Sequence, residues 1–133
     1  NQVRKWVIAP TATIVRRFRR ACPGVPVIGF PRGAGGLYLE YAEETGVDCV
    51  GIDSTVPLSV IRDTLQPVCA VQGNLDNRIL VGGGPALDEH AELILETLSQ
   101  GPFIFNLGHG VLPETPPGHV ARLAGLIREW TGP

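Results

Sequence analysis

The sequence predicts an α/β fold in which four parallel strands alternate with helices, the content of half a (β/α)8 barrel. Short apolar runs are separated by longer segments of helical periodicity, and polar and glycine residues gather directly after each run. Buried parallel strands read as continuous apolar runs. In a β/α barrel the active site lies at the carboxyl ends of the strands, so the polar residues after each run are the candidates for function.

The first predicted elements are a helix and a strand. Apolar residues recur at helical spacing from Val3 to about Cys22. Pro10 fits the first turn of a restarted helix, and Pro23 with Gly24 ends it. The apolar run 25–30 then predicts the first strand.

The second strand and its flanking helices follow. A glycine-rich loop, residues 31–36, leads into a predicted helix over 37–45. Gly46 is expected to close that helix in the left-handed conformation. The second strand is predicted over 49–52, and Asp53-Ser54-Thr55 connects it to a helix over 57–65.

The last two strands complete the series. The third strand is predicted over 68–71, with residues 72–76 following it. A Gly82-Gly83-Gly84 linker separates a short helical turn from a helix over 85–99. The fourth strand is predicted over 103–105 and the final helix over 117–130, which gives an α(βα)4 order.

The polar residues that follow the four strands should converge on one rim. They are Arg32, Asp53, Gln72, Asn74, Asp76, Asn106 and His109. Four strands alone leave two open sheet edges, so we expect a missing N-terminal half or a partner copy to complete the barrel. The sequence begins at Asn1 and contains no methionine, so we expect it to be an excerpt of a longer chain.

Composition limits the classes of function. The chain has 133 residues, 44% hydrophobic and 18% charged, and a net charge of -2. It can bury a core, and it lacks the general basic field of a nucleic-acid binder. Arginines cluster at positions 16, 17, 19 and 20. They spread over more than one helix face, so a solvated surface is favoured over an anion-binding patch.

The three cysteines, Cys22, Cys49 and Cys69, show no zinc-binding spacing, and their odd number fits a reducing compartment. Cys49 and Cys69 lie in apolar runs and are expected to be core residues. No signal peptide or membrane-spanning segment is apparent. We therefore expect a soluble, cytoplasmic protein that binds neither membrane nor nucleic acid.

The glycine-rich loop allows a dinucleotide-binding interpretation, with Asp53 as the ribose-binding acid. Tyr38 occupies the position of the third glycine, and no lysine-serine pair marks a phosphate loop, so this interpretation is disfavoured. A tight turn that approaches a ligand or the neighbouring loop is the simpler alternative. Taken alone, Asp53 is favoured as a helix-capping residue, and Asp76 has the same ambiguity between capping and function.

His109 lies between two glycines just after the fourth strand. Its imidazole can point into the rim and bind a carboxylate or relay a proton; alternatively, it is a loop histidine bound to a backbone carbonyl. His90 and His119 are assigned to helix surfaces. No nucleophilic set and no metal-binding spacing is visible, so a reaction without cofactor or metal is the simplest hypothesis.

Two segments, Gln72 to Asp76 and Phe105 to Gly110, resemble signature segments of the C-terminal half of the uroporphyrinogen decarboxylase family. Segments 27–35, 45–53 and 113–117 resemble further parts of that family in the same order. The resemblance covers nearly the whole chain.

The resemblance implies that residues 1–133 are the C-terminal part of a single TIM-barrel domain. The family's barrel is usually a homodimer and converts the four acetate side chains of uroporphyrinogen III to methyl groups, giving coproporphyrinogen III. No cofactor is needed, because a protonated pyrrole accepts the electrons released as carbon dioxide leaves. The enzyme stabilises that cation and holds the other carboxylates, a task suited to arginine.

Among the family's substrate contacts only the histidine carries over, onto His109, as a substrate-binding residue. The arginine-rich loop, the aspartate that contacts the pyrrole nitrogens and a tyrosine lie in the first half of the family's barrel, so we expect no main catalytic residue here and an inactive fragment. Asn77 stands where the family usually has proline and Ser54 where it has a bulkier residue. The first is expected to loosen a turn and the second to widen the pocket wall.

Two alternatives remain. A corrinoid-dependent methyltransferase of the same superfamily would share the barrel, but it would need zinc held by His and Cys near the strand ends, and the cysteines here are predicted inside strands. A non-catalytic half-barrel module that assembles with another chain is the second alternative.

Overall fold

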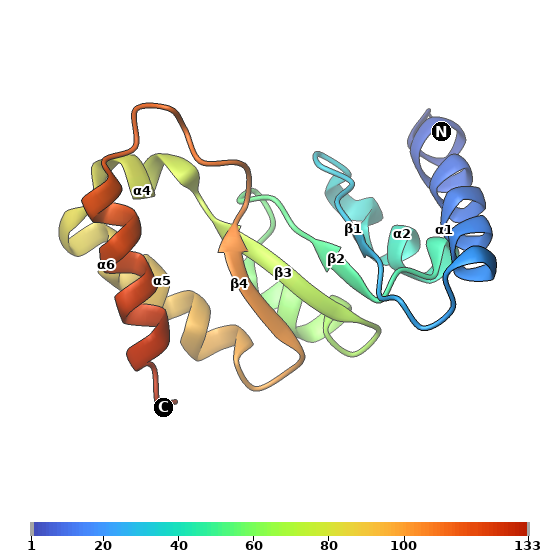
Figure 1. The fold of residues 1–133 in the computed structure, drawn as a ribbon. Helices are drawn as coiled ribbons and strands as arrows, with labels where there is room; N and C mark the ends of the chain where they lie inside the picture. Colours follow the sequence, from blue (N-terminus) through green and yellow to red (C-terminus); the bar gives the residue numbers. More distant parts are fainter. Residues whose placement is uncertain (1, 133) are drawn as a thin grey trace.

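The computed structural model describes residues 2–132 and has the predicted α/β architecture (Figure 1). Its four strands are β1 (Ile28–Gly29), β2 (Cys49–Gly51), β3 (Ala70–Leu75) and β4 (Phe103–Leu107). The α-helices are α1 (Ala9–Ala21), α2 (Tyr38–Thr45), α3 (Leu58–Val60), α4 (Asn77–Gly82), α5 (Gly84–Leu98) and α6 (Pro117–Glu129). Shorter helical turns are η1 (Arg4–Ile8), η2 (Gly35–Leu37) and η3 (Ile61–Leu65).

The sheet has the strand order β1-β2-β3-β4, and every neighbouring pair is parallel. A dinucleotide-binding sheet instead reverses its strand order at a switch point, where the ligand sits. The sequential order is that of an arc of a β/α barrel. Within the described residues, β1 and β4 each have one edge without a neighbouring strand.

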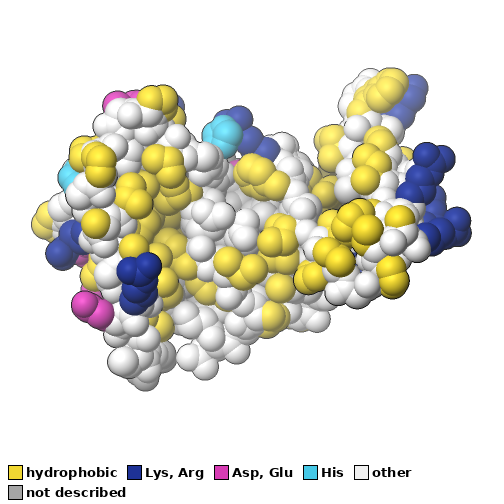
Figure 2. All heavy atoms as spheres, viewed as in Figure 1, with side chains coloured by type: hydrophobic (Ala, Val, Ile, Leu, Met, Phe, Trp, Pro, Cys, Tyr) yellow, Lys and Arg dark blue, Asp and Glu magenta, His cyan; other side chains and the backbone are white. Residues whose placement is uncertain are grey.

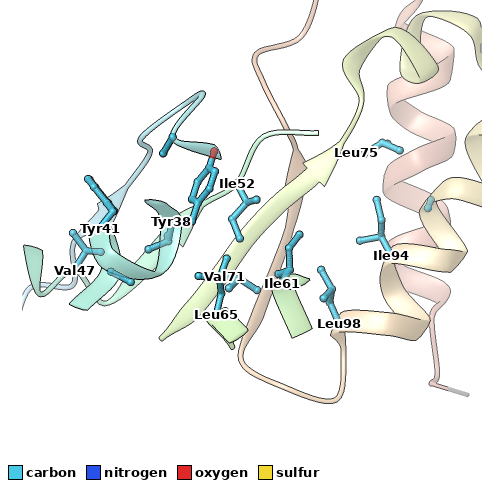
Figure 3. Close-up of a cluster of buried hydrophobic side chains, with 14 of the residues drawn as sticks. Tyr38, Tyr41, Val47, Ile52, Ile61, Leu65, Val71, Leu75, Ile94 and Leu98 are labelled. Carbon is cyan, nitrogen blue, oxygen red and sulfur yellow. The ribbon is translucent and has the colours of Figure 1, made fainter. Parts of the chain in front are cut away.

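The hydrophobic core lies between one face of the sheet and the helices. Val50 and Val71 are almost fully buried in it, and Val71 lies among Leu65, Ile61 and Leu98 in Figure 3. The alternate strand residues face the other way. Ile28, Phe30 and Ile104 of that face keep 49%, 46% and 45% of their surface exposed. Figure 2 shows hydrophobic side chains spread over the sheet face turned to the viewer, so this inner face is open.

The first predicted helix is present, but it contains a wide turn before Pro10. Residues 4–8 are π-helical, and the Ala9 N–H donates to the Arg4 carbonyl. Proline has no N–H for the carbonyl of Trp6 and its ring crowds that position. A π-turn relieves this conflict.

Two strands extend further than the sequence predicted. Pairing of β3 with β4 continues through Asn74 with Asn106 and Leu75 with Leu107. Gln72, Asn74 and Asn106 are therefore strand residues, not loop residues. Their polar side chains predict loop residues. At the rim, however, a strand can carry polar side chains while its backbone hydrogen bonds to the neighbouring strand continue. The first strand is conversely shorter than 25–30, because Pro26 cannot donate to a ladder.

The helices predicted over 37–45, 85–99 and 117–130 are confirmed to within about a residue, and Gly46 closes α2 at a φ of 67°. The helix predicted over 57–65 changes from α to π after Val60. The surface assignment of His119 was wrong: its ring is partly buried against Gly83, with Nδ1 3.0 Å from the Leu80 carbonyl. No helix in residues 2–132 has the length and apolar character needed to cross a membrane.

Candidate functional site

A hollow of about 680 Å³ lies where the four strands end. One predicted rim residue after each strand lines it: Arg32 after β1, Asp53 after β2, Asp76 after β3 and His109 after β4. Residues far apart in the chain thus meet because the carboxyl ends of parallel strands share one edge of the sheet.

A second hollow, of about 300 Å³, extends from this rim onto the inner face of the sheet. Phe30, Gln72, Asn106 and His109 are among its lining residues. His109 lines both hollows, so Gln72 and His109 lie at the same end of the sheet, as the converging-rim hypothesis requires. The loop after β4 that carries His109 rises above the end of the sheet in Figure 1.

Asn74 is the exception among the predicted rim residues. Its side chain is buried, and Nδ2 donates to the carbonyls of Asp53, at 3.1 Å, and Val56, at 2.9 Å. Asn74 lines neither hollow. Asn74 therefore holds the loop after β2 in place. The sequence could not predict this role, because both acceptors are backbone carbonyls of a loop distant in the chain.

The Asp53 carboxylate joins two loops of the rim. Oδ2 accepts hydrogen bonds from the Gly33 N–H at 2.9 Å and the Tyr38 hydroxyl at 2.6 Å, and Oδ1 accepts from the N–H of Thr55 at 2.9 Å and from its hydroxyl. Burial alone would raise the pKa of this carboxyl, but these hydrogen bonds outweigh it and lower the pKa to about 2. The helix-capping interpretation of Asp53 was wrong, because its partners belong to loops and to Tyr38.

The same contacts account for the glycine-rich loop. Gly33 adopts a φ of 76°, a left-handed conformation that glycine tolerates, and its N–H reaches the neighbouring loop at Asp53. Burial and the bond to Asp53 raise the pKa of the Tyr38 hydroxyl. The glycine-rich loop thus lets the backbone come close enough to bind Asp53. Both oxygens of Asp53 are occupied by these hydrogen bonds, so neither is free to bind a ribose.

Asp76 is confirmed as a helix-capping residue, since its side chain accepts from the Arg78 N–H at 2.8 Å at the start of α4. The next residue, Asn77, donates from Nδ2 to the Gly110 carbonyl at 2.9 Å. The expectation that Asn77 loosens this turn stays a prediction. The Asn77 side chain also connects the turn to the segment that carries His109, a bond that proline cannot make.

The His109 segment is also held by close backbone packing. The Gly108 N–H donates to the Leu75 carbonyl at 2.7 Å. A Cβ at Gly108 would lie 2.5 Å from the Ser54 nitrogen, so glycine is required by contact. The His109 ring itself is exposed, and within residues 2–132 it has no hydrogen-bond partner, unlike the other two histidines.

The arginine cluster of α1 lies elsewhere. Arg19 donates to Asp48 at 2.8 Å and to the Gly46 carbonyl at 2.7 Å. Arg16, Arg19 and Arg20 share a shallow groove with Glu43 and Glu44. Mixed charges and an internal ion pair favour the solvated-surface interpretation over an anion-binding patch.

Cys49 and Cys69 lie at the opposite end of the sheet from His109. Cys49 begins β2, and Cys69 directly precedes β3 rather than lying inside it. Burial raises the pKa of the Cys49 thiol to about 11, which disfavours the thiolate that zinc binding needs. Neither thiol can share a metal with His109. Across residues 2–132, no group of three or more His, Cys, Asp or Glu side chains is arranged to hold a metal ion.

Sequence reasoning missed two charged residues of the rim hollow, Arg78 and Glu114. Arg78 comes directly after Asp76 and Asn77, which follow the third strand. Its closeness to the predicted rim residue Asp76 could have identified it as a rim residue as well. Glu114 lies in the long connection between β4 and α6, where no periodicity indicates which side chains turn inward.

Comparison with known proteins gives a family match over most of the chain. The family model described as Uroporphyrinogen decarboxylase (URO-D) matches residues 1–130. A uroporphyrinogen decarboxylase of Rhodospirillum rubrum is 54% identical over 128 residues, which is 96% of this chain and 37% of the relative.

Other relatives show the same pattern. The protein of that name from Chelativorans sp. is 54% identical over 125 residues, 94% of this chain and 36% of its own length. That from Erythrobacter litoralis is 45% identical over 130 residues, 98% of this chain and 38% of its own length. The chain therefore spans a little over a third of the curated relatives it matches.

Proposed function

The chain belongs to the uroporphyrinogen decarboxylase family, and we propose that it supplies one side of the mouth of a complete barrel that decarboxylates uroporphyrinogen III. The product would be coproporphyrinogen III, with the four acetate side chains converted to methyl groups. The observation that carries this proposal is the convergence of all four strand-end loops on one hollow, with the exposed ring of His109 lining both that hollow and the inner-face hollow.

The chemistry needs no cofactor in this scheme. Protonation of a pyrrole ring gives a cation that accepts the electron pair of the breaking carbon–carbon bond as carbon dioxide leaves. The remaining CH₂ group then takes up a proton and becomes a methyl group. The ring releases the proton that it took up first, which restores the neutral pyrrole, so one proton is consumed for each carbon dioxide released. We place the groups that stabilise the cation in the part of the barrel that this chain does not contribute, so the chain alone would be inactive. Residues 1–133 would then form the C-terminal part of one barrel domain.

His109 is proposed as a substrate-binding residue. An imidazole with no partner among residues 2–132 can donate to a carboxylate of the macrocycle and can assist proton delivery. The inner-face hollow offers the aromatic ring of Phe30 and the amides of Gln72 and Asn106, which suits a flat, partly apolar ring. We further propose that the complete protein is a cytoplasmic homodimer.

A chimera tests the proposal. This chain would replace the matched segment of the Rhodospirillum rubrum relative, and conversion of uroporphyrinogen would be followed chromatographically. We expect an active chimera in which His109→Ala raises KM roughly tenfold, the value of one hydrogen bond to a charged group, and lowers kcat only partly. His90→Ala, which changes an exposed histidine on α5, is the control. A folded but inactive chimera would refute the function, and unchanged kinetics in His109→Ala would remove that residue from the site.

A further inference from the structure

We propose that Arg32 and Arg78 form a carboxylate-binding subsite beside His109, so that this chain binds an acidic arm of the ligand through two guanidinium groups as well as the imidazole. Both arginines line the rim hollow with His109. The identity of the ligand, a polycarboxylated pyrrole, rests on the proposed function. The placement of the two arginines rests only on the lining of the hollow.

The first argument is that neither guanidinium group has an ion-pair or hydrogen-bond partner among the residues that the structure describes. The ion pairs of residues 2–132 involve Arg4, Arg19, Arg62 and Arg122. Arg32 and Arg78 have no side-chain hydrogen bond to any described residue either. Both side chains are solvent-exposed. A planar guanidinium with free N–H groups is the side chain best suited to bind a carboxylate through two bonds.

The second argument is that the backbone beside each arginine is fixed by a strand-end acid. Asp53 binds the N–H of Gly33, the residue after Arg32, at 2.9 Å. Asp76 binds the N–H of Arg78 itself at 2.8 Å. Each acid therefore holds the segment that presents an arginine to the hollow, which reduces the ordering cost of binding.

The third argument concerns charge. The hollow also contains the carboxylates of Asp53, Asp76 and Glu114, which would repel an acidic ligand if they were free. Asp53 accepts hydrogen bonds from Gly33, Tyr38 and Thr55, and Asp76 accepts the helix N–H of Arg78. The Asp53 charge is thus directed at internal donors, whereas Asp76 accepts through one oxygen only. Glu114 has no such partner among the described residues, and it opposes the subsite.

Binding of a single pyrrole that carries one acetate and one propionate side chain and no amino group tests the subsite in the chain as it is. Dissociation constants would be measured by nuclear magnetic resonance titration at low salt. Arg32→Gln and Arg78→Gln should each weaken binding about two- to fivefold, the range of an exposed ion pair. Glu114→Gln should tighten it by a similar factor. Arg17→Gln, an exposed arginine of α1 outside the hollow, should leave it unchanged.

The dimethyl ester of the same pyrrole separates carboxylate recognition from apolar contact. We expect it to bind more weakly than the acid and to be insensitive to the two arginine substitutions. Equal binding of ester and acid, no binding of the acid, or unchanged affinity in both arginine variants would overturn the subsite. If the arginines matter here but the chimera does not turn over uroporphyrinogen, the subsite stands and the proposed function falls.

Discussion

At the scale of single residues, Asp53 is the buried charge on which the rim depends. It is 6% exposed, and hydrogen bonds from three other residues reach its two oxygens. A buried carboxylate is stable only when such donors replace water. Its loss should therefore affect the stability of the whole sheet end.

Asp53→Asn should lower the free energy of unfolding at neutral pH by about 1–3 kcal/mol, because buried donors lose a charged acceptor. The pKa of Asp53 in the folded chain is about 2, below the ordinary value of about 3.9. The charged form thus stabilises the fold above about pH 4, and this contribution is lost as the pH falls toward 2. Urea unfolding over that range should show the difference between wild type and variant shrinking in acid.

Asp63→Asn is the matched control for that experiment, since Asp63 is an exposed acid paired with Arg62. Its substitution should cost no more than about 1 kcal/mol. A difference between wild type and Asp53→Asn that stays constant from pH 7 to pH 2 would contradict the assigned role.

Gly108→Ala and Gly110→Ala should differ although they flank the same histidine. A Cβ at Gly108 meets the Ser54 backbone, whereas at Gly110 it meets no atom within 4 Å. The first should destabilise the chain by about 1–3 kcal/mol, as overpacking does, and the second by under about 0.5 kcal/mol. Thermal and urea unfolding of the pair measure this. Equal stability of the two variants would show that the close contact is absent.

The rim residues themselves could be predicted because they follow apolar runs, but their partners could not. Tyr38 and Gly33 lie 15 and 20 residues from Asp53 in the chain. No local pattern encodes a bond between two loops, so the helix-capping interpretation was preferred for Asp53 and failed. For Asp76 the partner is two residues away, and the local rule was correct.

At the scale of elements, the helices that cover the sheet follow hydrophobic periodicity closely. The helix predicted over 117–130 is α6, and that over 85–99 is α5. Strand ends are harder to predict, because β3 and β4 keep their ladder while their side chains become polar at Gln72 and Asn106. The sequence pattern reports the polarity of side chains and not backbone pairing. Gln72 therefore marks the end of the third strand in the sequence, although pairing and burial continue to Leu75.

Substitution of two leucines of α5 tests which face of that helix contributes to the free energy of unfolding. Leu98 is 1% exposed and packs in the core, whereas Leu93 is 52% exposed. Leu98→Ala should cost about 2–5 kcal/mol, and Leu93→Ala should stay within about 0.5 kcal/mol. Chemical denaturation of both variants gives the comparison. A larger loss for Leu93→Ala would mean that the helix lies on the sheet in another rotation.

At the scale of the whole molecule, the described chain leaves an apolar sheet face and two strand edges uncovered. Ile28, Phe30 and Ile104 contribute to that face, and hydrophobic side chains are visible across it in Figure 2. Such faces and edges promote association in water. The behaviour of the chain in solution should therefore depend on concentration.

Ile104→Lys should lower the association constant severalfold and leave the free energy of unfolding unchanged. A charge on an exposed apolar face opposes contact between copies of the chain. Sedimentation at increasing protein concentration measures the effect. Val120→Lys places the same charge on α6, outside the sheet, and should change association little. A wild-type chain that remains monomeric and shows slow hydrogen exchange in β1 and β4 would contradict the open-edge description.

The loop after β4 rests on the loop after β2, with Gly108 against the backbone of Asp53 and Ser54 and β3 between their strands. Adding or deleting a residue in either loop would therefore shift the other, and His109 with it. Insertions are usually tolerated in surface loops, but here the two loops have interdependent lengths. The shape of the rim hollow could therefore be altered by exchanging side chains more readily than by changing the length of either loop.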